Sequence, residues 1–134
     1  MILMDTHVLV HYANSDRKLG RRARTEIDHA LGHDELFVSA LTFWEISMLI
    51  AKGRLALETT VAGLRAAALR QGIQEIPLDG EIAIAAGELP AVHGDPVDRM
   101  LVATALVRGI ALMTADDTLL QWRLRGYRAH DASE

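Results

Sequence analysis

Short apolar runs alternate along this chain with longer segments in which apolar residues recur every three or four positions. A short, continuous apolar run bounded by turn residues is typical of a buried strand. The pattern predicts strands over residues 2–4, 36–38, 73–78 and 110–113, with a last edge strand over 127–129.

The longer, amphipathic segments predict helices. Capping residues and glycines mark their ends. Asp95 and Pro96, for example, are a typical helix start, because Asp accepts hydrogen bonds from free N–H groups and Pro suits the first turn. The predicted helices cover residues 6–12, 18–31, 41–52, 59–70, 80–89, 96–108 and 116–123.

The alternation of strands and helices indicates the fold class. Parallel strands need a long crossover connection, which is usually a helix. We therefore predict the α/β class, as a three-layer α/β/α sandwich with a short, mainly parallel central sheet. The 134 residues contain no internal repeat, low-complexity tract or linker, so we expect a single domain over residues 1–134.

The composition excludes several classes of protein and site. Apolar residues make up 50% of the chain and charged residues 24%, which is typical of a globular protein. Cysteine is absent, which excludes disulfides, thiol catalysis and thiolate-bound zinc. The most apolar stretch, residues 100–115, is too short to cross a bilayer, and the N-terminus lacks the features of a signal peptide. We expect a cytoplasmic protein without membrane contact.

Four carboxylates lie at the ends of predicted strands or in the first turns of predicted helices. Asp5 ends the first strand, Asp116 follows the strand over 110–113, and Glu45 and Asp98 lie in the first turns of their helices. Ligands of open α/β sheets bind beyond the carboxyl ends of the strands, so all four side chains could reach one crevice. Four converging carboxylates need a shared proton, an arginine or a divalent cation. Ligation by oxygen alone suits Mg²⁺ or Mn²⁺.

Helix capping is the alternative role for these acids. An Asp at a helix start accepts hydrogen bonds from free N–H groups and complements the helix dipole. Thr42 and Glu45 even have the spacing of a capping box. Against capping stands the apolar stripe that follows each acid, such as Met48 and Leu49 after Glu45. These stripes predict that each acid lies at the inward-facing end of its helix.

Positive charge is concentrated in one segment, although the net charge is −4. Arginine suits forked contacts with phosphate, but a cluster of this kind is by itself more typical of a solvated helix face. The cluster consists of Arg17, Lys18, Arg21, Arg22 and Arg24.

Two histidine pairs have the one-turn spacing of zinc-binding helices. His7 and His11 do not match the metalloprotease pattern, because Val8 stands where that pattern has a glutamate. His29 and His33 are interpreted as solvated residues of the basic helix.

Four stretches of the sequence, in this order, share the motifs of a known family. They cover residues 3–9, 38–46, 93–105 and 112–117, and the most specific is His93-Gly94-Asp95-Pro96-Val97-Asp98-Arg99. With them the chain resembles the PIN-domain endoribonuclease toxins of VapBC-type toxin–antitoxin pairs. The resemblance implies a catalytic metal site made of Asp5, Glu45, Asp98 and Asp116, with Asp117 as a second ligand or a cap. It also implies that Thr6, Ser39 and Thr114 orient carboxylates or waters.

The same resemblance implies a function. We expect a Mg²⁺- or Mn²⁺-dependent endoribonuclease that hydrolyses RNA phosphodiester bonds as the toxin of a type II toxin–antitoxin system. The implied partners are RNA, a cognate VapB-type antitoxin and a second copy of the chain.

Arg99 and, in the basic cluster, Arg21, Arg22 and Arg24 are candidates for holding RNA phosphates, and His93 is a candidate for substrate contact or a loop role. The alternative is a non-catalytic PIN-fold binding module whose acids are only helix caps.

Overall fold

The computed structural model describes residues 1–90 and 94–134. Within these residues the strands form one sheet in the order β3-β2-β1-β4-β5, and every neighbouring pair in it is parallel. This arrangement confirms the predicted α/β class. The sequence predicts a mainly parallel sheet, and the observed sheet is entirely parallel. The strands are β1 (Ile2–Met4), β2 (Leu36–Ser39), β3 (Gln74–Ile76), β4 (Ala111–Thr114) and β5 (Ala129–Asp131).

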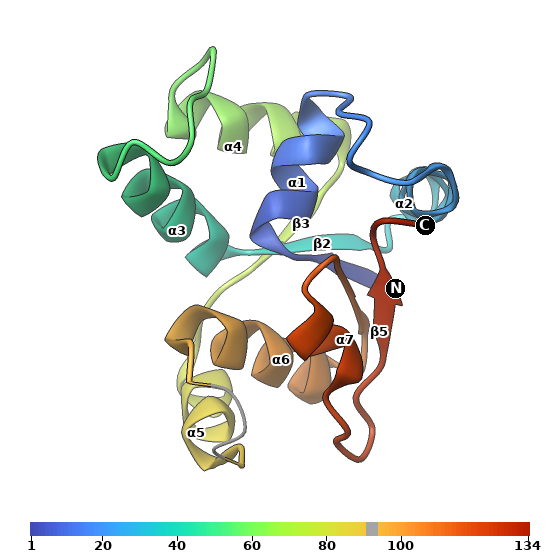
Figure 1. The fold of residues 1–134 in the computed structure, drawn as a ribbon, viewed down its shortest axis with the longest axis vertical. Coiled ribbons are helices and arrows are strands. Elements are labelled where there is room, and N and C mark those ends of the chain that lie inside the picture. Colours follow the sequence, from blue (N-terminus) through green and yellow to red (C-terminus); the bar gives the residue numbers. More distant parts are fainter. Residues whose placement is uncertain (91–93) are drawn as a thin grey trace.

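Helices cover both faces of the sheet, as Figure 1 shows. On one face lie α1 to α4, and on the other lie α5 to α7. The helices are α1 (Thr6–Ala13), α2 (Arg21–Gly32), α3 (Ala40–Ala51), α4 (Val61–Gln71), α5 (Gly80–Glu88), α6 (Pro96–Arg108) and α7 (Asp117–Gln121). None of the helices in the described part of the chain is long and apolar enough to span a membrane.

The core is divided by the sheet into two apolar clusters, because successive side chains of a strand point to opposite faces. Ile2 and Met4 of β1 pack with the helices α1 to α4, whereas Leu3 packs with α5 to α7. All three side chains are buried, so the central strand is apolar on both faces.

The strand register brings the ends of β1, β2 and β4 together at one edge of the sheet. Met4 pairs with Val38 of β2 and with Met113 of β4. The next residue, Asp5, donates its backbone N–H to the carbonyl oxygen of Met113 at 3.0 Å. The chain passes from each of these strand ends into a helix, or toward one, so the side chains that follow the strands share this edge.

Several boundaries differ from the predicted ones. The last strand lies at Ala129–Asp131 instead of 127–129, because its backbone pairs with β4 from Leu112 onward and an edge strand needs no apolar run. Helix α2 begins at Arg21 instead of residue 18. Gly20 precedes it, and a side chain at Gly20 would meet the backbone of residues 133 and 134, which packs against the helix start.

Candidate functional site

An acidic cleft of about 460 Å³ lies at the edge where β1, β2 and β4 end. It brings together the four acids that the sequence singles out, from four different elements of the chain. Its lining consists of Asp5, His7, His11, Lys18, Glu45, Asp95, Asp98, Ala115 and Asp116.

Asp5 is the buried acid of this cleft, with 8% of its surface exposed. One carboxylate oxygen, Oδ1, accepts a hydrogen bond from the backbone N–H of Thr6 at 2.7 Å, and the other, Oδ2, accepts one from the Thr114 hydroxyl at 2.7 Å. Burial raises the pKa of the Asp5 carboxyl, although both hydrogen bonds and the neighbouring His7 act in the opposite direction. Among the described residues Asp5 has no ion-pair partner. A bound cation would therefore stabilise the ionised form of the Asp5 carboxyl.

Thr114 connects two of the acids. Its hydroxyl donates to Asp5 and accepts a hydrogen bond from the backbone N–H of Asp116 at 3.1 Å. Thr6 also touches the acids, since a hydrogen bond from its side chain lowers the pKa of Glu45. Ser39 has a different part, because its hydroxyl accepts from the Leu41 N–H at 3.1 Å and so caps α3.

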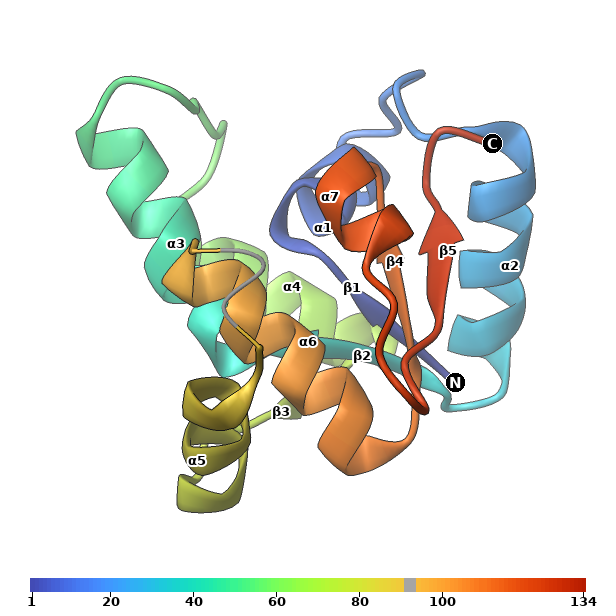
Figure 2. The ribbon, with the colours of Figure 1, turned by 60° about the horizontal axis from the view of Figure 1, so that its bottom comes forward.

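Glu45 lies in the second turn of α3. The cap of this helix is Ser39, so the capping-box interpretation of Thr42 and Glu45 is wrong. The predicted stripe after Glu45 is also wrong, because Met48 is 37% exposed. The buried side chains of α3 are those of Thr42, Phe43 and Ile46, and the far end of the helix extends away from the sheet (Figure 2).

Burial and the charges of Asp5 and Asp95 raise the pKa of the half-buried Glu45 carboxyl, because both effects disfavour its ionised form.

The remaining acids lie at the starts of α6 and α7. Asp95 caps α6, where its Oδ1 accepts from the N–H groups of Val97 at 2.9 Å and Asp98 at 3.3 Å. Asp98 lies in the first turn of α6, partly buried, and lines the cleft. The sequence interpretation took Asp95 only as a cap and missed that it also lines the cleft. A second Asp three residues before Asp98, on the same helix start, is the signal that could have indicated it.

Asp116 is exposed, which contradicts the prediction that every acid faces inward. It caps α7, and its Oδ1 accepts from the N–H groups of Thr118 at 2.8 Å and Leu119 at 3.2 Å. The helix is short and starts at the sheet edge, so its cap lies on the rim of the cleft. Asp117 is the first residue of α7 and does not line the cleft.

The donor set of the cleft fits a small divalent cation in its chemistry. Carboxylate and hydroxyl oxygens are hard ligands of the kind that Mg²⁺ and Mn²⁺ prefer. In the described parts of the chain, no three carboxylate or imidazole groups lie close enough together to enclose an ion as the side chains stand. The cleft therefore presents converging donors whose side chains would have to move inward around an ion.

The arginines of the sequence interpretation lie outside this lining. Arg99 donates its guanidinium hydrogen bonds to the carbonyl oxygens at the end of α5, namely those of Ala86 at 2.8 Å, Leu89 at 2.7 Å and Pro90 at 3.0 Å. Its role toward RNA stays a prediction.

The basic cluster contributes Lys18 to the lining, and its arginines lie elsewhere. Arg22 pairs with Glu26 at 3.5 Å, Arg24 lies over the Tyr12 ring, and Arg21 is exposed. Their RNA-binding role also stays a prediction. The candidate role of His93 falls outside the described residues.

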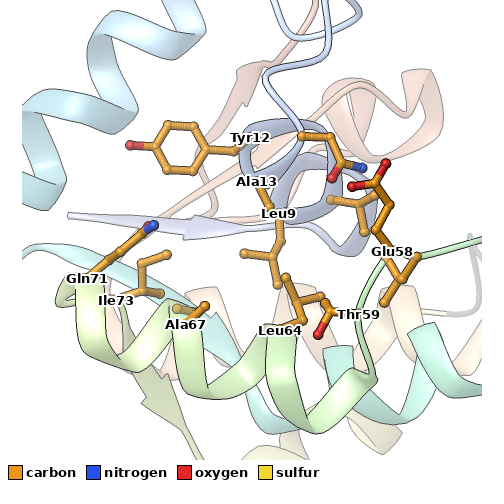
Figure 3. A pocket seen from close by; sticks show the side chains of 13 residues that line it. Leu9, Tyr12, Ala13, Glu58, Thr59, Leu64, Ala67, Gln71 and Ile73 are labelled. Carbon is orange, nitrogen blue, oxygen red and sulfur yellow. The ribbon is translucent and has the colours of Figure 1, made fainter.

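A second hollow, of about 300 Å³, lies between α1 and α4 and is mainly apolar (Figure 3). Leu9 and Tyr12 border it from α1, and Leu64 and Ala67 from α4. Glu58 is the one acid in its described lining. Acid–base catalysis and metal ligation need several polar groups, so the acidic cleft is the better candidate for the reaction site.

Comparison with known proteins identifies the family. The sequence pattern of the PIN domain matches residues 2–122. The chain belongs to the PIN domain family. A curated relative, Ribonuclease VapC22 of Mycobacterium tuberculosis, is 31% identical over 128 residues, which cover 95% of this chain and 92% of the relative.

Solved structures share the fold of this PIN domain protein. One is VapBC2 from Rickettsia felis bound to a DNA fragment from its promoter, with a TM-score of 0.70, 14% identity and coverage of 98% of both chains. Another is DNA-bound VapBC from Salmonella typhimurium, with a TM-score of 0.66, 19% identity and coverage of 97% of this chain and 96% of that one. At such identities these likenesses establish the fold alone.

Proposed function

We propose that this chain, as a single PIN domain over residues 1–134, is an endoribonuclease and the toxin of a type II toxin–antitoxin system. It would hydrolyse RNA phosphodiester bonds with Mg²⁺ or Mn²⁺ held by Asp5, Glu45, Asp98 and Asp116. The observation that carries this proposal is the buried Asp5 carboxylate, which opens onto a cleft shared with the other three acids. The relationship to a protein named as a ribonuclease gives independent support.

The residues of the cleft have different roles in the proposed reaction. When bound, a divalent cation supplies an activated water and neutralises charge on the phosphate. Thr114 and the Thr6 N–H hold the two Asp5 oxygens in place, so that the carboxylate is oriented before substrate arrives. Glu45 lines the same cleft from α3 and would supply a further carboxylate oxygen to the cation. Attack by water on the phosphorus, with the P–O3′ bond breaking and the 3′-oxygen leaving and taking up a proton, gives a 5′-phosphate and a 3′-hydroxyl end.

The test is cleavage of labelled single-stranded RNA by protein freed of metal with EDTA. We expect no cleavage until Mn²⁺ or Mg²⁺ is added, and 5′-phosphate ends afterwards. Asp98→Asn should abolish cleavage while the metal-free protein stays as stable or becomes more stable, because one repelling charge is removed. Cleavage that persists in EDTA, or in purified Asp98→Asn protein, contradicts the proposal.

A non-catalytic binding module is the second candidate, and one observation favours it. Asp5 and Asp116 do accept hydrogen bonds from helix N–H groups, as caps do. Glu45 does not, since it lies in the second turn of α3 and Ser39 caps that helix. Acids that act only as caps would bind no Mn²⁺, so a calorimetric Mn²⁺ titration separates the two candidates.

The proposed partners follow from the same function. We propose that RNA is the substrate and that a VapB-type antitoxin restrains the enzyme, as the VapBC names of the similar structures suggest. A toxin that cuts cellular RNA acts in the cytoplasm. We also propose a homodimer, for which the exposed Trp44, beside Leu41 and Met100 in a small apolar hollow, offers a surface.

A further inference from the structure

One wall of the acidic cleft carries nitrogen donors instead of carboxylates. His7 and His11 project from the outer side of α1, one turn apart, with ring centroids separated by 6.4 Å. Lys18 lines the cleft as well, from the turn that follows α1. The opposite side of α1 is apolar and buried at Val8 and Leu9, which fixes the direction in which both imidazoles point. We call His7, His11 and Lys18 the donor wall.

The backbone around Lys18 is held against the end of α1. The Asp16 N–H donates to the carbonyl oxygen of His11 at 2.9 Å, and the Asp16 carboxylate accepts from the Lys18 N–H at 2.9 Å. Leu19, the next residue, is buried in the core with 4% of its surface exposed. The place of Lys18 beside His11 is therefore set by the fold and is not that of a lysine on a free loop.

The donor wall leads from the acids outward. His7 follows Asp5 by two residues and interacts electrostatically with both Asp5 and Glu45, so the wall begins beside two of the proposed metal ligands. His11 interacts with His7 on one side and with Lys18 and Asp16 on the other. Burial lowers the pKa of His11, so its imidazole is neutral near pH 7 and donates one N–H.

A strand of RNA that enters this cleft meets repulsion from the acids wherever its phosphates are not in contact with a cation. Proteins that bind single-stranded nucleic acid counter this repulsion with a positively charged groove that follows the backbone. We propose that the donor wall binds the RNA phosphates on one side of the bond to be cut, an inference that rests on the proposed ribonuclease function. Lys18 forms an ion pair with a phosphate, His11 and His7 donate hydrogen bonds, and the three together set the direction in which the strand lies.

The chain offers a matched control for two members of the wall. Lys18→Gln is compared with Lys52→Gln, which changes the exposed lysine that ends α3. His11→Asn is compared with His33→Asn, which changes an exposed histidine at the end of α2. Both control residues lie outside the cleft lining.

The first measurement is binding of a short fluorescein-labelled single-stranded RNA of mixed sequence, by anisotropy in EDTA, at several salt concentrations. All variants carry Asp98→Asn, which prevents cleavage and removes one repelling charge. Lys18→Gln should make the slope of log K against log salt shallower by about 0.7, so that a fourfold rise in salt weakens binding about 2.6-fold less than in the parent protein. His11→Asn should weaken binding about threefold to tenfold without changing the slope, since it removes a hydrogen bond and no charge.

The second measurement is cleavage of the same RNA with Mn²⁺ in the otherwise native chain. Both donor-wall variants should raise KM and leave kcat unchanged, whereas the two control variants should change neither. If the native chain cuts no RNA but Lys18→Gln still flattens the salt dependence, the ribonuclease function fails and phosphate binding by the wall stands.

Three results would overturn the donor wall itself. One is a salt slope for Lys18→Gln equal to that of Lys52→Gln. Another is a fall in kcat with KM unchanged. The third is that Lys18→Gln and His11→Asn bind RNA as the parent protein does but bind the co-expressed antitoxin less tightly. That result would assign these side chains to a protein interface.

Discussion

The hydroxyl of Thr114 donates to the Oδ2 atom of Asp5 at 2.7 Å, across the two neighbouring parallel strands β4 and β1. The two residues are 109 positions apart in the sequence, and the bond exists because Met4 and Met113 are in register. The same hydroxyl accepts the N–H of Asp116. One small side chain therefore fixes the orientation of the buried acid and the start of the turn that carries another acid.

Replacing this hydroxyl should affect both stability and metal binding. Thr114→Val keeps the shape of the side chain but leaves a buried carboxylate oxygen without its donor, so we expect the free energy of unfolding to fall by about 1–3 kcal/mol. Urea unfolding measures this loss, and Mn²⁺ titration should show weaker binding. Thr104→Val is the matched control: that hydroxyl is equally buried but bonds to the carbonyl oxygen of Met100 within α6. Equal Mn²⁺ affinities in the two variants would show that the bond to Asp5 does not organise the site.

The contribution of Asp5 and Glu45 to the stability of the metal-free protein should fall as pH rises. Burial raises the pKa of Asp5 in the folded state above that in the unfolded chain, and the pKa of Glu45 is raised as well. The unfolded chain therefore releases these protons at lower pH than the folded one. The stability that the protonated acids contribute is fully present below the ordinary carboxyl pKa and is lost as pH rises through the raised values.

Urea unfolding in EDTA from about pH 4 to about pH 7 measures this dependence. Asp5→Asn and Glu45→Gln should each reduce it, because their side chains have no proton to release. Added Mn²⁺ should restore stability most at the upper end of the range, where the acids are ionised. A stability that rises with pH in EDTA, and rises equally in both variants, would contradict the raised pKa values.

Much of this arrangement follows from local patterns in the sequence. The apolar runs of β1 and β4 and the acids that follow them are adjacent in the chain, so Asp5 and Asp116 could be placed at strand ends without a structure. What the patterns miss depends on contacts between distant segments. Strand β5, for example, is specified by pairing with β4 and not by its own side chains.

Arg99 makes contacts that its sequence context does not indicate. It lies next to Asp98 in the most specific of the four motif stretches, and its guanidinium donates to the carbonyl oxygens of Ala86, Leu89 and Pro90. Nothing local indicates this, because the partners belong to the end of α5 and the contact forms only when α5 packs on α6.

This geometry predicts that Arg99 supports the fold. Arg99→Lys keeps the charge but loses the planar fork that reaches several carbonyl oxygens, so the free energy of unfolding should fall by about 1–3 kcal/mol. Arg70→Lys, at an exposed position of α4, should change it little. Urea unfolding gives the comparison. Unchanged stability of Arg99→Lys, together with a higher KM for RNA, would instead favour the role in phosphate binding.

The last prediction concerns growth and its control by a partner. If the acidic cleft cuts RNA, induction of the native chain alone should arrest growth, and Asp5→Ala should not, because the buried ligand at the centre of the cleft is removed. Asp117→Ala is the matched control: this Asp lies beside the site without lining the cleft, so the variant should remain toxic.

Co-expression of the neighbouring reading frame should rescue growth and yield a complex that no longer binds Mn²⁺ at the cleft. The physical basis is that an arginine of the partner can form paired hydrogen bonds with these carboxylates and take the place of the cation. Growth is followed by optical density and viable counts, with the amount of each folded variant checked in parallel. Equal arrest by the native chain and by Asp5→Ala would exclude cleavage at this site as the cause of toxicity and would place the non-catalytic binding module ahead. Rescue by a partner whose complex still binds Mn²⁺ would instead locate the restraint outside the cleft.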